Sequence, residues 1–209
     1  MTPAMTRRQF LYGAGALGGL LLAPALPVWA RADMPPGRRA PAAFVDLSAA
    51  LLGIEHSVLD PAVAPDDLAL ASVFYDLGSR AGPDGLHQLE REYIRWSTSG
   101  MHGAVIAHAL LTAGVNLPRT DAVGTFARLT MLMWLYGVWY GGTECDRHSG
   151  ARAHITDPAY QVDGIVSGRA YRAAWIWRVA QAHPPGFSQF SFGSWAEPPP
   201  SLADYGIHV

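Results

Sequence analysis

The stretch TMLMWLYGVWYGGTECDRH, residues 130–148, decides the fold of this chain, because it opens with a long uncharged run that other parts of a protein have to enclose. Its first half holds two Trp and two Tyr, and the glycines Gly141 and Gly142 then lead to the only cysteine, Cys145. A membrane-spanning helix needs about 20 apolar residues, whereas Arg128 and Glu144 bracket only about fifteen. The stretch therefore predicts a helix that is apolar on all sides and is surrounded by other helices.

The aromatic content allows two interpretations of this helix. It is either the central helix of a bundle of about six helices, or part of a surface that another protein covers. Trp and Tyr are enriched where protein partners bind most strongly, and the chain has seven Trp in 209 residues. Both interpretations remain open from the sequence.

The segments on either side have the period of amphipathic helices, so we expect a small all-α bundle. Phe44, Leu47, Leu51 and Leu52, for example, form one helical stripe. Asp60 or a residue near Pro65 is expected to start the second helix, and Asp121 or Thr120 the fifth. The expected segments are a Pro-rich leader at 33–42, a helical domain at 43–183 with helices near 43–55, 60–82, 83–99, 101–114, 120–142 and 168–183, a polar link at 143–167, and an irregular aromatic tail at 184–209.

The first 32 residues have the layout of an export signal. The paired arginines Arg7 and Arg8, followed by Phe10 and Leu11, resemble the twin-arginine signal, and a Gly- and Ala-rich run then ends at the small-residue site before Ala32. A single N-terminal membrane anchor is the alternative, but several glycines and prolines interrupt the run. Twin-arginine export carries folded proteins, which predicts a cofactor or partner acquired before export.

Nothing in the sequence predicts a catalytic site. The chain has no metalloprotease, nucleophile-elbow or phosphate-loop motif, and its net charge of -2 does not indicate a nucleic-acid partner. Cys145, His148 and His154 are the only spaced candidates for a metal, although structural zinc normally takes four ligands in paired spacings.

Cys145 lies in the polar context GGTECDRH, which predicts an exposed thiol. In an oxidising compartment a single cysteine suggests an intermolecular disulfide. A buried, unreactive thiol is the alternative.

Five segments resemble, in order, the small subunit of bacterial membrane-associated, FAD-dependent sugar and polyol dehydrogenases, the sorbitol, fructose and glucose dehydrogenase complexes. The chain departs from that family at Leu52, at Gly142, and in a tail that lacks a cysteine. The similar segments are TRRQFL (6–11), FVDLSAALLGIEHSVLD (44–60), WLYGVWYGG (134–142), AYRAAWIW (170–177) and FGSWAEPP (192–199).

The resemblance implies a non-catalytic subunit without a cofactor of its own. In such complexes a large flavoprotein subunit carries FAD and oxidises the sugar or polyol, and a multihaem cytochrome c subunit with haem c passes the electrons on. The small subunit escorts the large one through the twin-arginine system and stays bound, which implies a periplasmic complex peripheral to the inner membrane.

Partner contacts are expected where aromatic residues fall in the similar segments and in the tail. The tail is expected to lie across another surface, either its own or that of a partner. A small periplasmic metalloprotein and a ligand-binding helical bundle are the alternative functions. The expected interface residues are Trp139, Tyr140, Tyr171, Trp175, Phe192 and Trp195, with Cys145 as a candidate for an intermolecular disulfide.

Overall fold

The computed structural model describes residues 39–59, 69–114 and 117–180. Helices take up 69% of these residues, which confirms the all-α class. In chain order the elements are α3 (Ala42–Leu52), α4 (His56–Leu59), α5 (Leu70–Ala81), α6 (Pro83–Thr98), α7 (Gly103–Leu111), β1 (Thr112–Gly114), β2 (Leu117–Pro118), α8 (Ala122–Tyr136), β3 (Val138–Tyr140), α9 (Gly141–Arg147), α10 (Ala151–His154), the 3-10 turn η1 (Pro158–Tyr160), β4 (Asp163–Ile165), α11 (Gly168–Arg172) and α12 (Trp175–Val179).

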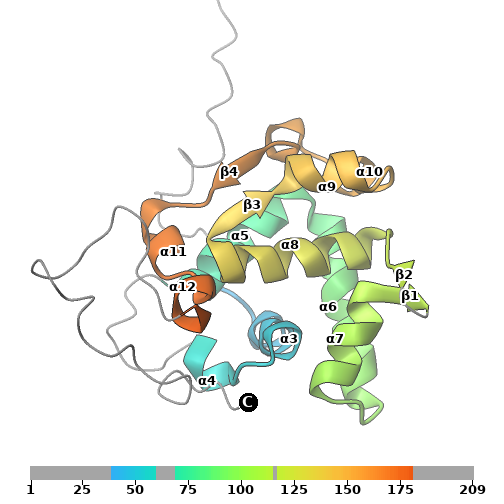
Figure 1. The fold of residues 1–209 in the computed structure, drawn as a ribbon. Coiled ribbons are helices and arrows are strands. Elements are labelled where there is room, and N and C mark those ends of the chain that lie inside the picture. The colour runs from blue at the N-terminus through green and yellow to red at the C-terminus, as the bar shows by residue number, and fades with distance from the viewer. Residues whose placement is uncertain (1–38, 60–68, 115–116, 181–209) are drawn as a thin grey trace, which may run out of the picture.

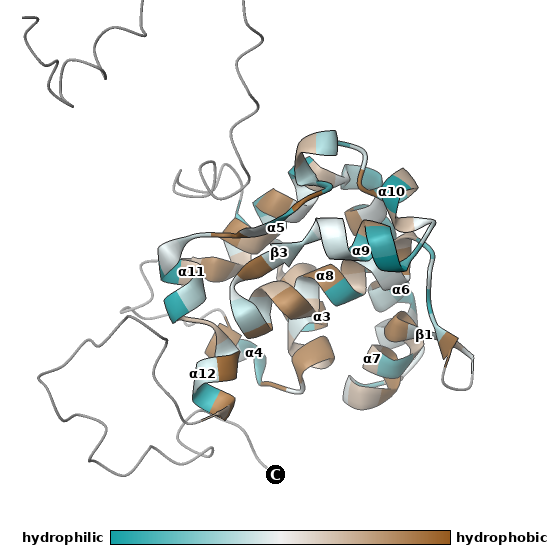
Figure 2. Cartoon of the chain, turned by 45° about the horizontal axis from the view of Figure 1, so that its top comes forward, coloured by the Kyte–Doolittle hydropathy of each residue, from teal (hydrophilic) through white to brown (hydrophobic). Residues whose placement is uncertain are grey.

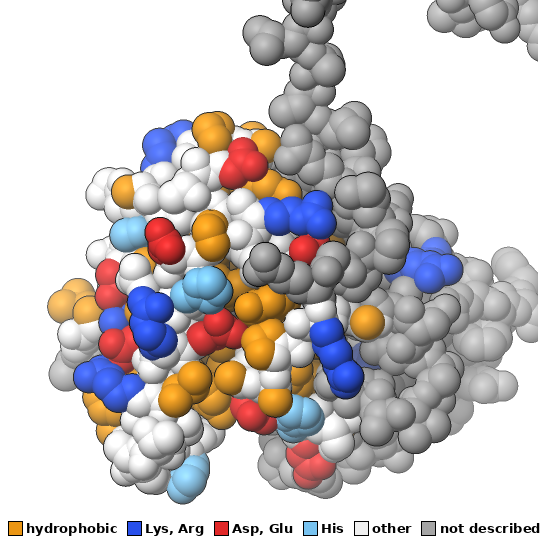
Figure 3. Space-filling model, turned by 180° about the vertical axis from the view of Figure 1, so that it is seen from behind, with side chains coloured by type: hydrophobic (Ala, Val, Ile, Leu, Met, Phe, Trp, Pro, Cys, Tyr) orange, Lys and Arg blue, Asp and Glu red, His pale blue; other side chains and the backbone are white. Residues whose placement is uncertain are grey.

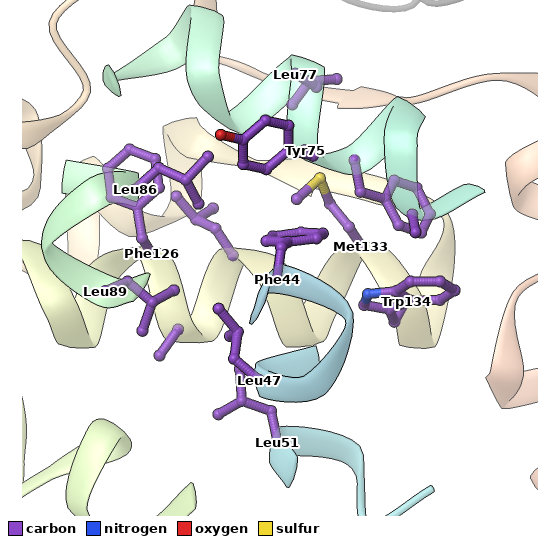
Figure 4. Close-up of a cluster of buried hydrophobic side chains, with 14 of the residues drawn as sticks. Phe44, Leu47, Leu51, Tyr75, Leu77, Leu86, Leu89, Phe126, Met133 and Trp134 are labelled. Carbon is purple, nitrogen blue, oxygen red and sulfur yellow. The ribbon is translucent and has the colours of Figure 1, made fainter. Parts of the chain in front are cut away.

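Helix α8 is the centre of the molecule. Figure 1 shows it across the middle, with α3 and α4 below it, α6 and α7 to its right, and β3, β4, α9 and α10 above. Figure 4 shows side chains from α3, α5, α6 and α8 pointing toward one another in a single core. Phe44, Phe126 and Met133 are each at most 1% exposed there. The expectation of an enclosed central helix is confirmed only in part: Met133 and Trp134 of α8 are buried, but Tyr136 at its end is 36% exposed.

The helix starts and stops follow local chemistry where the chain offers it. The carboxylate of Asp121 accepts a hydrogen bond from the backbone N–H of Gly124, so Asp121 is the N-cap of α8. Pro83 occupies the first turn of α6, where its missing N–H costs nothing. Gly53 ends α3 in the left-handed conformation, with a φ of 66°.

The central helix is shorter than expected. It ends at Tyr136 rather than near residue 142, because Gly137 takes the left-handed conformation (φ 64°) and its N–H bonds the carbonyl of Met133. Residues 138–140 then form strand β3. Helix α8 thus has 15 residues, one fewer than α6.

Two other helices also differ from expectation. Helix α7 ends at Leu111, and the residues after it pair as the antiparallel strands β1 and β2. The last helix is broken into α11 and α12 by Ala174, whose backbone is extended (ψ 138°). The polar link 143–167 holds most of α9 and all of α10, η1 and β4.

Several expectations fall outside the described residues. They concern Arg7, Arg8, Phe10 and Leu11 of the export signal, the Asp60 helix start, and the tail residues Phe192 and Trp195. Within 39–59, 69–114 and 117–180, no helix combines the length and apolar character needed to cross a membrane.

Seen from behind, arginine and acidic side chains alternate on the surface around a central apolar area (Figure 3).

Candidate partner-binding surface

A two-stranded ribbon links the end of the central helix to the C-terminal elements. Strands β3 and β4 pair antiparallel, with Val138 opposite Ile165 and Tyr140 opposite Asp163. Side chains alternate between the two faces of a strand, so Trp139 points to the opposite side from these four residues. One face of the ribbon thus turns toward the core, and the other turns outward.

Trp139 belongs to the core. It is 0% exposed, its indole Nε1 donates to the carbonyl oxygen of Tyr160 at 2.7 Å, and the two rings meet edge to face at 6.2 Å. Gly141 leaves room for this contact, because a Cβ there would lie 2.3 Å from Nε1 of Trp139. The expectation that Trp139 lies at a partner surface is corrected: its indole is enclosed and satisfied within this chain.

Tyr140 lies on the outward side of the ribbon and is partly exposed. Its ring meets that of Tyr136 edge to face at 6.2 Å. Burial raises the pKa of the Tyr140 phenol, and Tyr136, Asp163 and Tyr171 nearby raise it further. These neighbours show that residues from α8, β3, β4 and α11 meet at one place.

Helices α11 and α12 add two more aromatic side chains to this region, Tyr171 and Trp177. The ring of Tyr171 packs edge to face on Trp177 at 5.3 Å, and the indole Nε1 of Trp177 donates to the carbonyl of Tyr171 at 2.7 Å. Both side chains are partly exposed. We define the aromatic face as the side chains of Tyr136, Val138, Tyr140, Ile165, Tyr171 and Trp177.

Trp175 is not part of the aromatic face. It is 2% exposed, and the guanidinium of Arg178 lies 4.6 Å from the centre of its ring. The expectation that Trp175 contacts a partner is therefore corrected, because Trp175 packs into the core of its own chain. In α12 the indole of Trp177 is the more accessible of the two.

A buried ion pair fixes α9, which follows the ribbon, to the central helix. The guanidinium of Arg128 donates through Nε and Nη2 to both carboxylate oxygens of Glu144, at 2.8 to 3.1 Å. Their side chains are only 14% and 5% exposed. Nη1 of Arg128 also donates to the carbonyl of Arg119. His148 lies beside the pair, with Nε2 at 4.0 Å from Oε2 of Glu144.

A second polar contact joins α9 to strand β4. The carboxylate of Asp163 accepts from the backbone N–H of Thr143 at 2.9 Å and from its hydroxyl at 2.6 Å. Asp163 is opposite Tyr140 in the ribbon. The two polar contacts hold the ribbon between α8 and α9, and so fix the outward side chains of the aromatic face.

Cys145 is buried in α9, not exposed in a loop. It is 7% exposed, and desolvation raises the pKa of its thiol, while Arg152 nearby offsets part of the rise. A protonated, enclosed thiol reacts slowly with a disulfide partner. The expected exposure of Cys145 is wrong, and an intermolecular disulfide there would require α9 to move.

The residues that the sequence offered as candidate metal ligands do not form a metal site in the described part of the chain. Among residues 39–59, 69–114 and 117–180, no three His, Cys, Asp or Glu side chains are arranged to hold a metal ion. His148 lies beside Glu144, and His154 lies close enough to Asp121 to lower the pKa of that carboxyl.

Sequence reasoning found two residues of the aromatic face, Tyr140 and Tyr171, and missed Tyr136, Val138, Ile165 and Trp177. The missed signal is the sequence GVWY, 137–140, in which a β-branched and two aromatic residues follow a glycine. Such residues favour a strand, and a strand sends alternate side chains outward.

Comparisons with protein-family models, curated proteins and solved structures find no match to this chain.

Proposed function

We propose that this chain is a non-catalytic subunit that escorts and stabilises the large subunit of a FAD-dependent sugar or polyol dehydrogenase. It would accompany that subunit through twin-arginine export and stay bound in the periplasmic complex at the inner membrane. FAD would belong to the large subunit and haem c to a cytochrome subunit. The leader sequence TRRQFL supports the export step.

The observation that carries the proposal is the meeting of two segments that resemble the family. Residues 134–142 and 170–177 are separated in sequence, yet a Cβ on Gly137 would lie 2.6 Å from the backbone of Ala170, and Tyr171 lies near enough to Tyr140 to raise the pKa of its phenol. Together the two segments supply the aromatic face. Partly exposed aromatic clusters on a rigid base are the usual anchors of protein interfaces.

The base of this surface is suited to a contact that must survive export. The ribbon is held by the Arg128–Glu144 pair and by the Asp163 contact to Thr143, so its outward side chains need little ordering on binding. A preorganised surface loses less conformational entropy when it binds. This fits a permanent subunit contact better than a transient one.

The export step is tested by coexpression of the chain with the large flavoprotein subunit of a sugar or polyol dehydrogenase complex, followed by fractionation. The double variant Arg7→Lys, Arg8→Lys should leave both proteins in the cytoplasm. The double variant Arg38→Lys, Arg39→Lys makes the same change at a second pair of arginines and should leave export intact. Normal periplasmic flavoprotein in the first variant would overturn the escort function.

A further inference from the structure

The aromatic face lies at the point where the described chain ends. Helix α12 ends at Val179, which is 48% exposed, and it carries Trp177 of the face. Figure 2 shows apolar and hydrophilic residues alternating along α11 and α12. Any segment that follows residue 180 must therefore start next to this face.

The chemistry of the face and of the following segment is complementary. The segment 168–180 has three arginines and no acidic residue, whereas 181–209 has two acidic residues, Glu197 and Asp204, and no basic side chain except histidine. The face is aromatic and aliphatic, and so is the tail. The apolar anchors of the tail are Phe187, Phe190, Phe192, Trp195 and Tyr205.

The tail is also long enough to cover the face. Fully extended, residues 181–209 would reach roughly 90 Å, while a domain of this size is only about 40 Å across. A tethered segment acts at an effective concentration of about millimolar. This gives the chain's own tail an advantage over any free partner or second copy that is present at micromolar concentration.

We propose that the C-terminal segment 187–197 of this chain docks across its own aromatic face. Phe192 and Trp195 supply the apolar contacts, and Glu197 lies among the arginines of α11 and α12. The docking concerns the part of the aromatic face on α11 and α12, next to residue 180, and leaves the part on the β3–β4 ribbon for the large subunit. The docking itself does not depend on the proposed export function.

Hydrogen exchange of the purified chain, measured peptide by peptide with mass spectrometry, tests the docking. Deletion of residues 186–209 removes none of the described elements, so helicity by circular dichroism should be retained. We expect amides in 165–179 to exchange about tenfold faster in the truncated chain. Amides in α3 and α6 should be unchanged. A synthetic peptide of residues 186–199, added at millimolar concentration, should restore the protection.

Point variants separate docking from a general effect of the tail. Phe192→Ser with Trp195→Ser should reproduce the faster exchange, whereas Ser188→Ala with Ser191→Ala should behave as the full chain. Equal exchange in the full and truncated chains would overturn the proposal. Protection that rises with protein concentration would also overturn it, because a second copy would then be the occupant. Export of the flavoprotein is a separate measurement, so failure of one proposal leaves the other standing.

Discussion

Arg128 and Glu144 form a bidentate ion pair that joins the central helix to α9, with the guanidinium Nη2 at 2.8 Å from Oε2. Both side chains are largely enclosed, at 14% and 5% exposure. Removal of one member of such a pair leaves the other charge buried and uncompensated, whereas replacement of both by apolar residues can be nearly neutral. The pair therefore contributes more to the position of α9 than to net stability.

Arg128→Met should lower the free energy of unfolding by about 3 kcal/mol, measured by urea denaturation. The double variant Arg128→Met, Glu144→Leu should recover much of this loss. Arg95→Met breaks the more exposed pair with Glu92 and should cost less than about 1 kcal/mol. Equal losses of unfolding free energy for Arg128→Met and Arg95→Met would contradict the burial of the Arg128–Glu144 pair.

Gly137→Ala should destabilise the chain far more than Gly53→Ala. Both glycines end helices with φ near 65°, so both alanines bear the same left-handed strain of about 1 kcal/mol. A Cβ on Gly137 would also meet the backbone of Ala170 at 2.6 Å, while one on Gly53 meets nothing within 4 Å. Thermal unfolding of the two variants measures the difference, and similar melting temperatures would show that α11 does not approach Gly137 so closely.

Asp121 should make the chain sensitive to acid. Burial alone would raise the pKa of its carboxyl, but hydrogen bonds from Gly124 and Arg119, with the charges of Arg119 and His154, lower it overall. A lowered pKa stabilises the fold above the carboxyl's ordinary pKa, and this stability is lost as the pH falls through the lowered value. Asp121→Asn should therefore be less stable than the wild type at pH 7 and equal to it in acid. A constant difference across that pH range would rule out the charge effect.

The ionised carboxylate of Glu90 should destabilise the fold at neutral pH, unlike that of Asp121. Its Oε1 is buried without a hydrogen-bond partner among the described residues, and desolvation raises the pKa of the carboxyl, with His87 partly offsetting the rise. A raised pKa imposes a cost that appears as the pH rises from the ordinary value through the raised one. Glu90→Gln should stabilise the chain at pH 7 but not in acid, by urea denaturation at each pH. Glu92→Gln, which loses the contact to Arg95, should show no such gain.

The proposed function predicts that Ile165→Arg weakens binding of the large subunit. Ile165 is 45% exposed on the outward side of β4, and Ile94, at 46%, offers a matched control on α6. A charge at the centre of an interface is desolvated without a partner, so we expect the affinity to fall about tenfold or more for Ile165→Arg and to stay unchanged for Ile94→Arg. Surface plasmon resonance with the immobilised flavoprotein measures both. Equal affinities would place the partner contact elsewhere.

Local sequence signals predicted the parts of the fold that depend on neighbours in the chain. The stripe through Phe44, Leu47 and Leu51 is buried in α3 as expected, Asp121 caps α8, and Pro83 begins α6. These features depend on helical period, caps and proline geometry, which act within one or two turns. For this reason the all-α class and most of the helix positions could be predicted.

The candidate surface could be predicted only in part. Tyr140 and Trp139 are adjacent in the sequence and equally aromatic, yet one is partly exposed and the other fully buried. In a helix the two side chains would point only about 100° apart. The pairing of 138–140 with 163–165 separates them further, because a strand sends neighbouring side chains to opposite faces.

The sequence by itself determined the helical class and the central place of the apolar helix that became α8. Only the tertiary structure decided which aromatic side chains face outward and that Cys145 is buried. The physical reason is that the β3–β4 register, the Trp139 hydrogen bond to Tyr160 and the Arg128–Glu144 pair join residues between 16 and 27 positions apart. Local propensity carries no information about contacts at that separation.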